Sequence, residues 1–211
     1  MSKQPSRSYL LRLLSERNQF PDRVAHIDEL IRKTFERRVA ILALDMCGFS
    51  RLTAQHGIIH YLAMIHQMED AARPAVTGNG GQVIKQEADN LFAIFDAPAS
   101  ALEAALDIFR AFEAINTVVP PERDIYGSIG IGYGETLVIG EEDLFGSEMN
   151  LASKLGEDLA EPNEILLTAA AYAALPGGFY RCEPADFSLS GIELRCRRFV
   201  EKIEPEQTTV R

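Results

Sequence analysis

The sequence contains few cysteines, no excess of positive charge and no long apolar run, and each absence excludes a class of protein. Its 211 residues include three cysteines, Cys47, Cys182 and Cys196, an odd number without the spacing of a zinc site or a disulfide framework. The formal net charge of −10 disfavours nucleic-acid and anionic-membrane partners, because these bind clustered Lys and Arg. No stretch approaches the roughly 20 apolar residues of a membrane span, and residues 1–18 lack the apolar core of a signal peptide. We therefore expect a cytoplasmic protein.

Apolar residues instead recur with the periods of strands and helices, which predicts an α+β fold. After residue 38 the predicted order is strand, helix, strand, strand, helix, strand, which is the order of a ferredoxin-like βαββαβ sandwich. The strands are expected at about 39–46, 82–87, 89–95 and 126–133, and the helices at about 56–76 and 98–116. The further elements are expected to be a strand near 136–140, a helix near 147–158, the strand-like run EILLT and a C-terminal pair near 178–201.

On this basis the sequence divides into an N-terminal helical leader at 1–37, a main domain at 38–203 and a C-terminal tail at 204–211. The leader has two apolar patches at helical spacing, separated by Pro21: Leu10, Leu11, Leu13 and Leu14, then Val24, Ile27, Ile31 and Phe35. The patches fall short of the heptads that define a coiled coil. The leader is interpreted either as helices that pack on their own domain or as a dimerising or signal-input element.

Two aspartates, Asp45 and Asp89, adjoin apolar strands, where a carboxylate is costly unless it is paired or bound to a cation. In a ferredoxin-like sheet the first and third strands are antiparallel neighbours. Because Asp45 ends the first strand and Asp89 precedes the third, their carboxylates should meet at one edge. Hard oxygen ligands at that separation suit Mg²⁺ or Mn²⁺, which keep water or substrate phosphates as further ligands. The simpler alternatives are a helix N-cap for Asp45 and a turn residue for Asp89.

The turn after Asp45 adds a candidate site for an anion. The residues CGFS precede a short predicted helix. The backbone amides of Gly48, Phe49 and Ser50 would then lie at a helix N-terminus, where they could cradle a phosphate. Metal ligands beside a phosphate cradle indicate phosphoryl or nucleotidyl chemistry.

Three motifs, LDMCGFSRLT, GGQVIKQEADNLFAIF and EEDLFGSEMNLASKL, come in the order and approximate spacing of the class III nucleotide cyclase catalytic domain. The sequence resembles that family over about residues 38–200. The resemblance implies a catalytic homodimer with its site at the subunit interface, which converts a nucleoside triphosphate to a 3′,5′-cyclic monophosphate and pyrophosphate. It also implies two ions, Mg²⁺ or Mn²⁺, at each site.

Carried over residue by residue, the resemblance implies that Asp45 and Asp89 bind the metals together with the backbone carbonyl of Met46. Lys85 and Asp143 match the pair that selects the base, and this combination is typical of adenine rather than guanine. ATP is therefore the favoured substrate. Taken alone, Lys85 would be interpreted as a solvated residue of the strand, and only its combination with Asp143 favours the base-selecting role.

Asn150 matches the residue that orients the ribose, and Lys154 stands where the family has an arginine that stabilises the transition state. In the family's geometry these two residues and the base-selecting pair come from one protomer, and the metal ligands come from the other. Lysine keeps the charge of arginine but lacks its planar fork. Two further departures are Ser190, where a lysine that contacts phosphate is expected, and Ala88, where a glycine precedes the second aspartate.

These departures leave three hypotheses open. The first is an adenylate cyclase, and the second is a cyclase that acts on GTP or a pyrimidine triphosphate. The third is a catalytically silent module that binds nucleotide or dimerises for regulation. Both metal-binding aspartates are present, which argues against the third hypothesis, because a silent site has no need to bury that charge.

Two other patterns have simpler explanations than a further site. His56 and His60 have the i, i+4 spacing of zinc ligands, but without an HExxH motif or a third ligand they are interpreted as surface or packing residues. Gly130, Gly132 and Gly134 lie on one strand face at period two, which predicts that another backbone packs closely there.

Overall fold

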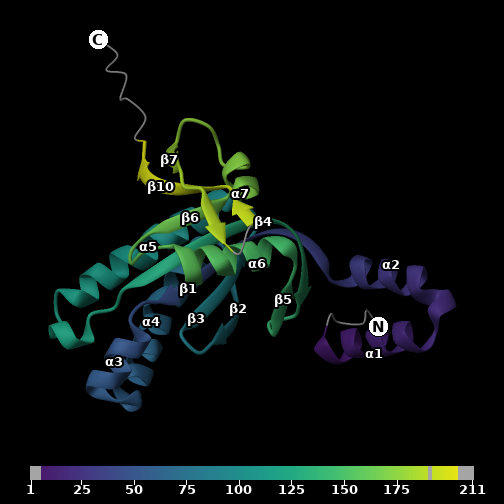
Figure 1. Ribbon diagram of the computed structural model, residues 1–211, viewed down its shortest axis with the longest axis horizontal. Helices are drawn as coiled ribbons and strands as arrows, with labels where there is room; N and C mark the ends of the chain where they lie inside the picture. Colours follow the sequence, from purple (N-terminus) through teal and green to yellow (C-terminus); the bar gives the residue numbers. More distant parts are fainter. Residues whose placement is uncertain (1–5, 190–191, 204–211) are drawn as a thin grey trace, which may run out of the picture.

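The computed structural model of the protein describes residues 6–189 and 192–203, and within them the chain is a mixed α+β structure (Figure 1). Its main sheet has the strand order β2-β3-β1-β4-β6-β10-β7, and β5 pairs with β4 outside this path. These strands are β1 (Glu36–Met46), β2 (Gln82–Glu87), β3 (Asn90–Phe95), β4 (Gly127–Ile139), β5 (Asp143–Phe145), β6 (Ile165–Thr168), β7 (Tyr180–Pro184) and β10 (Cys196–Lys202). A separate hairpin consists of β8 (Phe187–Leu189) and β9 (Ile192–Leu194).

The helices lie at the N-terminus and on both faces of the sheet. They are α1 (Arg7–Gln19), η1 (Pro21–Arg23), α2 (Val24–Phe35), α3 (Phe49–His56), α4 (Ile58–Gly78), α5 (Pro98–Asn116), η2 (Pro121–Arg123), α6 (Ser147–Lys154), η3 (Leu155–Leu159) and α7 (Ala169–Ala173). The segment η3 is a π-helix that directly continues α6. Among the described residues, no helix combines the length and the apolar character that crossing a membrane requires.

The first four strands confirm the predicted ferredoxin-like arrangement. β1 lies between β3 and β4 and is antiparallel to both, and β2 pairs with the outer edge of β3. β6 then joins β4 in parallel and extends the sheet toward β10 and β7. The additional C-terminal strands were also expected from the sequence.

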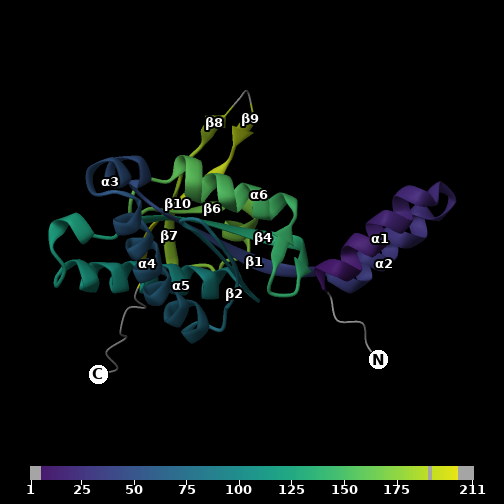
Figure 2. The ribbon, with the colours of Figure 1, turned by 90° about the horizontal axis from the view of Figure 1, so that it is seen from below.

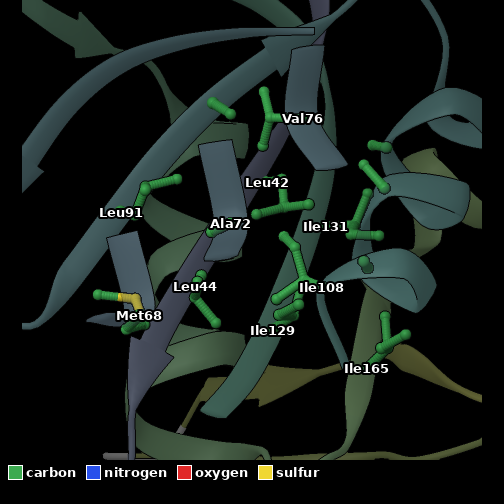
Figure 3. Packing of buried hydrophobic residues seen from close by; sticks show 14 of the residues in the cluster. Leu42, Leu44, Met68, Ala72, Val76, Leu91, Ile108, Ile129, Ile131 and Ile165 are labelled. Atoms are coloured by element: carbon green, nitrogen blue, oxygen red, sulfur yellow. The ribbon is translucent and has the colours of Figure 1, made fainter. Parts of the chain in front are cut away.

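Side chains of β1 alternate between two apolar layers, which explains why its sequence is an uninterrupted apolar run. Leu42 and Leu44 pack with residues of α4 and α5, including Met68 and Ile108 (Figure 3). On the opposite face, Ile41 belongs to the cluster that α6 covers. Each fully buried aliphatic side chain contributes about 1.5–3 kcal/mol to folding, so both layers hold the end of β1 in place.

The glycines of β4 allow α6 to lie directly against the sheet. A Cβ atom on Gly130 would overlap the carbonyl oxygen of Ala152. A Cβ atom on Gly132 would lie 2.5 Å from the carbonyl oxygen of Glu148, and one on Gly134 would lie 2.7 Å from the Cγ of Glu148. The prediction of close backbone packing at this stripe is therefore confirmed.

One predicted element is wrong, one corresponds closely to the structure, and one observed element was not predicted. The separate strand near 136–140 is wrong, because β4 continues without a break to Ile139 and the chain turns only at Gly140, with φ of 56°. The long helix predicted at 56–76 corresponds to α4, which begins after Gly57 with φ of 85°, and the short helix predicted after CGFS corresponds to α3. The hairpin of β8 and β9 was not predicted at all.

Helices α1 and α2 form a hairpin that projects from one end of the sheet (Figure 2). Their buried residues are Leu10, Leu13, Ile27, Ile31 and Phe35, and Ile139 of β4 joins this cluster. An ion pair of 2.5 Å between Arg17 and Asp28 links the two helices. The hairpin therefore packs on its own chain through Ile139, while Leu11 and Leu14 of the same predicted patch remain 55% and 38% exposed.

Candidate active site

Asp45 and Asp89 come together at one end of the sheet, as the strand order predicted. Asp45 is opposite Asn90 in the register of β1 and β3, and Asp89 precedes Asn90 in the turn after β2. The backbone N–H of Met46 donates a 3.2 Å hydrogen bond to the carbonyl oxygen of Asp89. The apolar run of β1 buries the strand up to Leu44 and leaves Asp45 half-buried at its end.

Several acidic side chains gather at this end of the sheet, and their negative charges repel one another. Burial first, then the charge of Asp89, then those of Glu157 and Asp158 raise the pKa of Asp45 to about 7. Among the side chains that the structure describes, neither Asp45 nor Asp89 forms an ion pair with Lys or Arg. Glu157 and Asp158 lie on the π-helical segment η3, and π-helical turns are frequent at functional sites. Sequence reasoning missed both acids, since only the fold brings them to β1.

The side chain of Asp89 has a hydrogen-bond partner that the sequence gave no reason to expect. The hydroxyl of Tyr61, on α4, donates a 2.7 Å hydrogen bond to Oδ2 of Asp89. Burial and this carboxylate raise the pKa of Tyr61, so the phenol stays protonated. Ala88, the residue directly before Asp89, has a left-handed backbone with φ of 53°. Asp89 is thus held in a tight turn whose left-handed position is occupied by Ala88, where the resemblance implied a glycine.

The donor set at this position suits a hard divalent cation that brings its own ligands. Asp45 and Asp89 offer carboxylate oxygens, and the backbone carbonyl of Met46 was the third predicted ligand. Across residues 6–189 and 192–203 no group of three His, Cys, Asp or Glu side chains converges as a complete metal site. Mg²⁺ and Mn²⁺ fit such an incomplete set, because water and substrate phosphates supply their remaining ligands. The rings of His56 and His60 lie 4.8 Å apart at an interplanar angle of 37°, and a ring nitrogen of His60 lies 2.9 Å from the carbonyl oxygen of Glu122.

A helix N-terminus follows Asp45, as the CGFS motif predicted. Gly48 has φ of 99° and precedes the first residue of α3, and no side chain caps this end of the helix. Phe49 and Ser50 form the first turn through their backbone, which leaves first-turn amides oriented outward. The N–H of Cys47 donates a 2.8 Å hydrogen bond to the carbonyl of Tyr126, which anchors the turn on the start of β4.

Lys85 and Asp143, predicted as the base-selecting pair, are in contact. Nζ of Lys85 lies 2.9 Å from Oδ1 of Asp143 and 3.1 Å from Oε2 of Glu87. A register shift between Val83 and Lys85 changes the direction of the strand at this point. Nζ also lies 5.1 Å from the centre of the Phe92 ring. Glu87 was not predicted to take part, although its period-two spacing from Lys85 on a strand was a usable signal.

Asn150 and Lys154 both lie on the exposed face of α6, one helical turn apart. In the described part of the chain, neither side chain has a hydrogen bond or ion pair. Ser190, where a phosphate-binding lysine was expected, lies outside the described residues. Arg198, on β10, pairs with Glu164.

The geometry therefore combines two strand-end carboxylates, a helix N-terminus and a lysine–aspartate pair on one sheet of an α+β fold. These are the parts that a nucleotide-processing domain requires. The sequence matches the family described as "Adenylate and Guanylate cyclase catalytic domain" over residues 31–200. The chain belongs to this family, which confirms the resemblance inferred from its three motifs.

Curated relatives and solved structures agree with this membership. Over 140 residues the chain is 28% identical to a Rhizobium meliloti (strain 1021) protein named "Putative adenylate cyclase 3", covering 66% of this chain and 24% of that protein. It is 28% identical over 138 residues to an adenylate cyclase of Streptomyces coelicolor, covering 65% and 34%. The chain thus spans only about a quarter to a third of the length of these two relatives. A crystal structure described as adenylate/guanylate cyclase/hydrolase from Silicibacter pomeroyi has 27% identity and a TM-score of 0.64, covering 79% of this chain and 98% of that one.

Proposed function

We propose that this protein is a metal-dependent nucleotide cyclase that converts ATP to 3′,5′-cyclic AMP and pyrophosphate. The observation that carries the proposal is the pairing of Asp45 with Asp89 beside the uncapped N-terminus of α3. Such an arrangement concentrates negative charge that a divalent cation can neutralise, next to amides that bind phosphate. The similar proteins named adenylate cyclase support the same reaction.

In the proposed reaction the ribose 3′-oxygen forms a bond to the α-phosphorus and the bond from that phosphorus to the bridging oxygen of pyrophosphate breaks. Two Mg²⁺ or Mn²⁺ ions at Asp45, Asp89 and the Met46 carbonyl would favour loss of the 3′-hydroxyl proton and offset the charge of the triphosphate. The first-turn amides of α3, from Gly48 through Phe49 and Ser50, bind phosphate oxygens. The protein's own part is chiefly to position the reacting groups.

Lys85 and Asp143 are proposed to read the base. Lys85 offers a donor, and the carboxylate of Asp143 offers an acceptor. Adenine presents the complementary pair, because its ring nitrogen N1 accepts and its exocyclic amine donates. The Lys85–Asp143 contact of 2.9 Å keeps the donor and acceptor adjacent, as this recognition requires.

Asn150 is proposed to orient the ribose, and Lys154 to stabilise the charge that develops on the transferred phosphoryl group. Both side chains are exposed on α6, where a second protomer could present them to a nucleotide. We therefore propose a homodimer in which one protomer supplies the metal ligands and its partner supplies Lys85, Asp143, Asn150 and Lys154. Residues 38–203 would form the catalytic domain, with the helices of 1–37 as a separate element.

The test is an assay of the purified protein with each of the four nucleoside triphosphates and either Mn²⁺ or Mg²⁺, with products identified by mass. The proposal expects cyclic AMP from ATP, and loss of this product in Asp45→Ala and Asp89→Ala. A cyclic product from another triphosphate alone would change the substrate but keep the reaction. Nucleotide binding without turnover in either metal would contradict the enzymatic proposal and support a silent binding module.

A further inference from the structure

The side chain of Tyr61 reaches the candidate metal site from the core of the protein. Tyr61 is the fourth residue of α4 and is 1% exposed. Its ring lies in the same apolar cluster as Leu44 and Met64, so packing fixes the position of the phenol oxygen. That oxygen donates a 2.7 Å hydrogen bond to Oδ2 of Asp89. A buried hydroxyl thus contacts one of the two aspartates directly.

We propose that Tyr61 is a positioning residue for the metal site, which orients the Asp89 carboxylate by occupying Oδ2 and leaving Oδ1 for a divalent cation. This inference rests on the proposed metal-dependent function. Asp89 needs such a restraint because it follows Ala88 in a tight turn, where its side chain would otherwise rotate. The backbone of Asp89 is held by the Met46 N–H at 3.2 Å, and Tyr61 does the same for its side chain.

Asp45 provides the contrast within the same site. Its carboxylate has no hydrogen bond to another described side chain, so it is free to adjust to a bound ion. Asp89, in contrast, is fixed before the ion arrives. A carboxylate held at one oxygen favours coordination through the other oxygen alone, which suits the strict octahedron of Mg²⁺. Ca²⁺ more readily takes both oxygens of a carboxylate, so Tyr61 disfavours it.

The experiment compares Mn²⁺ binding by the wild-type protein and Tyr61→Phe, which removes only the hydroxyl. Free Mn²⁺ is measured by electron paramagnetic resonance in the presence of an ATP analogue that lacks the 3′-hydroxyl and cannot cyclise. Because partners of metal ligands typically contribute 10- to 100-fold to metal affinity, we expect the Mn²⁺ dissociation constant to rise about tenfold or more. Ca²⁺ should compete with Mn²⁺ better in the variant than in the wild type.

The matched control is Tyr180→Phe. The hydroxyl of Tyr180 donates a 2.8 Å hydrogen bond to Oε1 of Glu103, on β7 and α5. This variant loses an equivalent bond between a tyrosine and a carboxylate and should leave the Mn²⁺ dissociation constant unchanged. Circular dichroism and thermal unfolding of both variants establish that the fold is retained.

An unchanged Mn²⁺ dissociation constant in folded Tyr61→Phe would overturn the positioning role, and so would equal weakening in Tyr180→Phe. The variant Asp89→Asn separates this failure from failure of the proposed function. If Asp89→Asn abolishes Mn²⁺ binding while Tyr61→Phe leaves it intact, only the role of Tyr61 is wrong. If Mn²⁺ binding is absent in the wild type or survives in Asp89→Asn, the metal site and the inference fall together.

Discussion

At the end of β1, the carboxylates of Asp45 and Asp89 lie close together, and none of the lysine and arginine side chains that the structure describes pairs with them. Along β2, Lys85 instead lies between the carboxylates of Asp143 and Glu87, at 2.9 and 3.1 Å. The first region is electrostatically incomplete without a cation, and burial with like charge raises the pKa of Asp45 to about 7. The second region is already paired: burial alone would lower the pKa of Lys85, but the hydrogen bonds and charges of Asp143 and Glu87 together outweigh burial and raise it.

The difference between the two regions separates two tasks, binding a cation and presenting hydrogen-bonding groups. A region with unpaired charge loses folding stability but binds its counter-ion strongly, because the ion relieves the repulsion. A region with paired charge is stable alone and offers donors and acceptors in a fixed arrangement, which favours selectivity over affinity. Substitutions in the two regions should therefore affect activity and stability differently.

The largest expected effect comes from Asp45→Asn. Turnover should fall at least about a thousandfold, because a metal ligand is lost. The metal-free variant should nevertheless be more stable than the wild type at pH 8, by about 1–3 kcal/mol. The folded state holds the Asp45 proton more tightly than the unfolded state, so its destabilising effect develops as pH rises from about 4 to about 7.

Urea denaturation in a chelator at pH 4 and pH 8 measures this effect. The advantage of Asp45→Asn over the wild type should be small at pH 4 and full at pH 8. Equal stability of the two proteins at both pH values would contradict the idea of strained negative charge at this end of the sheet.

Lys85→Met, in contrast to Asp45→Asn, should lower the stability of the metal-free protein. It breaks the contacts with Asp143 and Glu87 and should lower stability by about 1–3 kcal/mol, because it leaves the carboxylate of Asp143, which is 13% exposed, without its charged partner. Catalytic efficiency with ATP should fall about 10- to 100-fold, since a hydrogen bond to a charged group is worth about 1.5–3 kcal/mol. Steady-state kinetics with ATP and GTP measure the loss. The control Glu87→Gln, whose side chain is 73% exposed, should change the ATP efficiency only a few-fold.

Lys154→Arg tests the positive charge on α6 that has no partner among the described residues. Arginine supplies a planar fork that can bridge two phosphate oxygens, so turnover should rise about threefold to tenfold. The KM for ATP should change less, because the contact is made chiefly in the transition state. Rates of Lys154→Arg and Lys154→Gln, compared with wild type, check this. A slower arginine variant would mean that the rest of the site is fitted to lysine.

The smallest effect is expected from Ala88→Gly. Ala88 has φ of 53°, a conformation that costs a residue with a Cβ atom about 1 kcal/mol and costs glycine little. The variant should gain about 0.5–1 kcal/mol in the free energy of unfolding and keep its turnover within about twofold. Chemical denaturation of the two proteins decides this. A destabilised variant would show that the methyl group contributes more by restricting the unfolded chain than it costs in the turn.

The parts of the fold that could be predicted were those with a local signal. The apolar runs of β1 and β3 identified the strands, and the order of elements gave their antiparallel pairing. That pairing was enough to bring Asp45 and Asp89 together. The base-selecting pair depended on the motifs, since nothing in the neighbourhood of Lys85 or Asp143 indicates that β5 folds back beside β2.

The parts that were missed depend on contacts between distant segments. Tyr61 precedes Asp89 by 28 residues, and its hydroxyl reaches the Asp89 carboxylate only because α4 packs beside the turn. Glu157 and Asp158 reach β1 only through the π-helical turn after α6.

Diffraction from crystals soaked with Mn²⁺ and an ATP analogue without a 3′-hydroxyl tests the central claim most directly. The account predicts anomalous peaks within about 2.0–2.6 Å of carboxylate oxygens of both Asp45 and Asp89, with triphosphate oxygens completing the coordination. Nucleotide bound without manganese at these two residues, or manganese bound elsewhere, would contradict it.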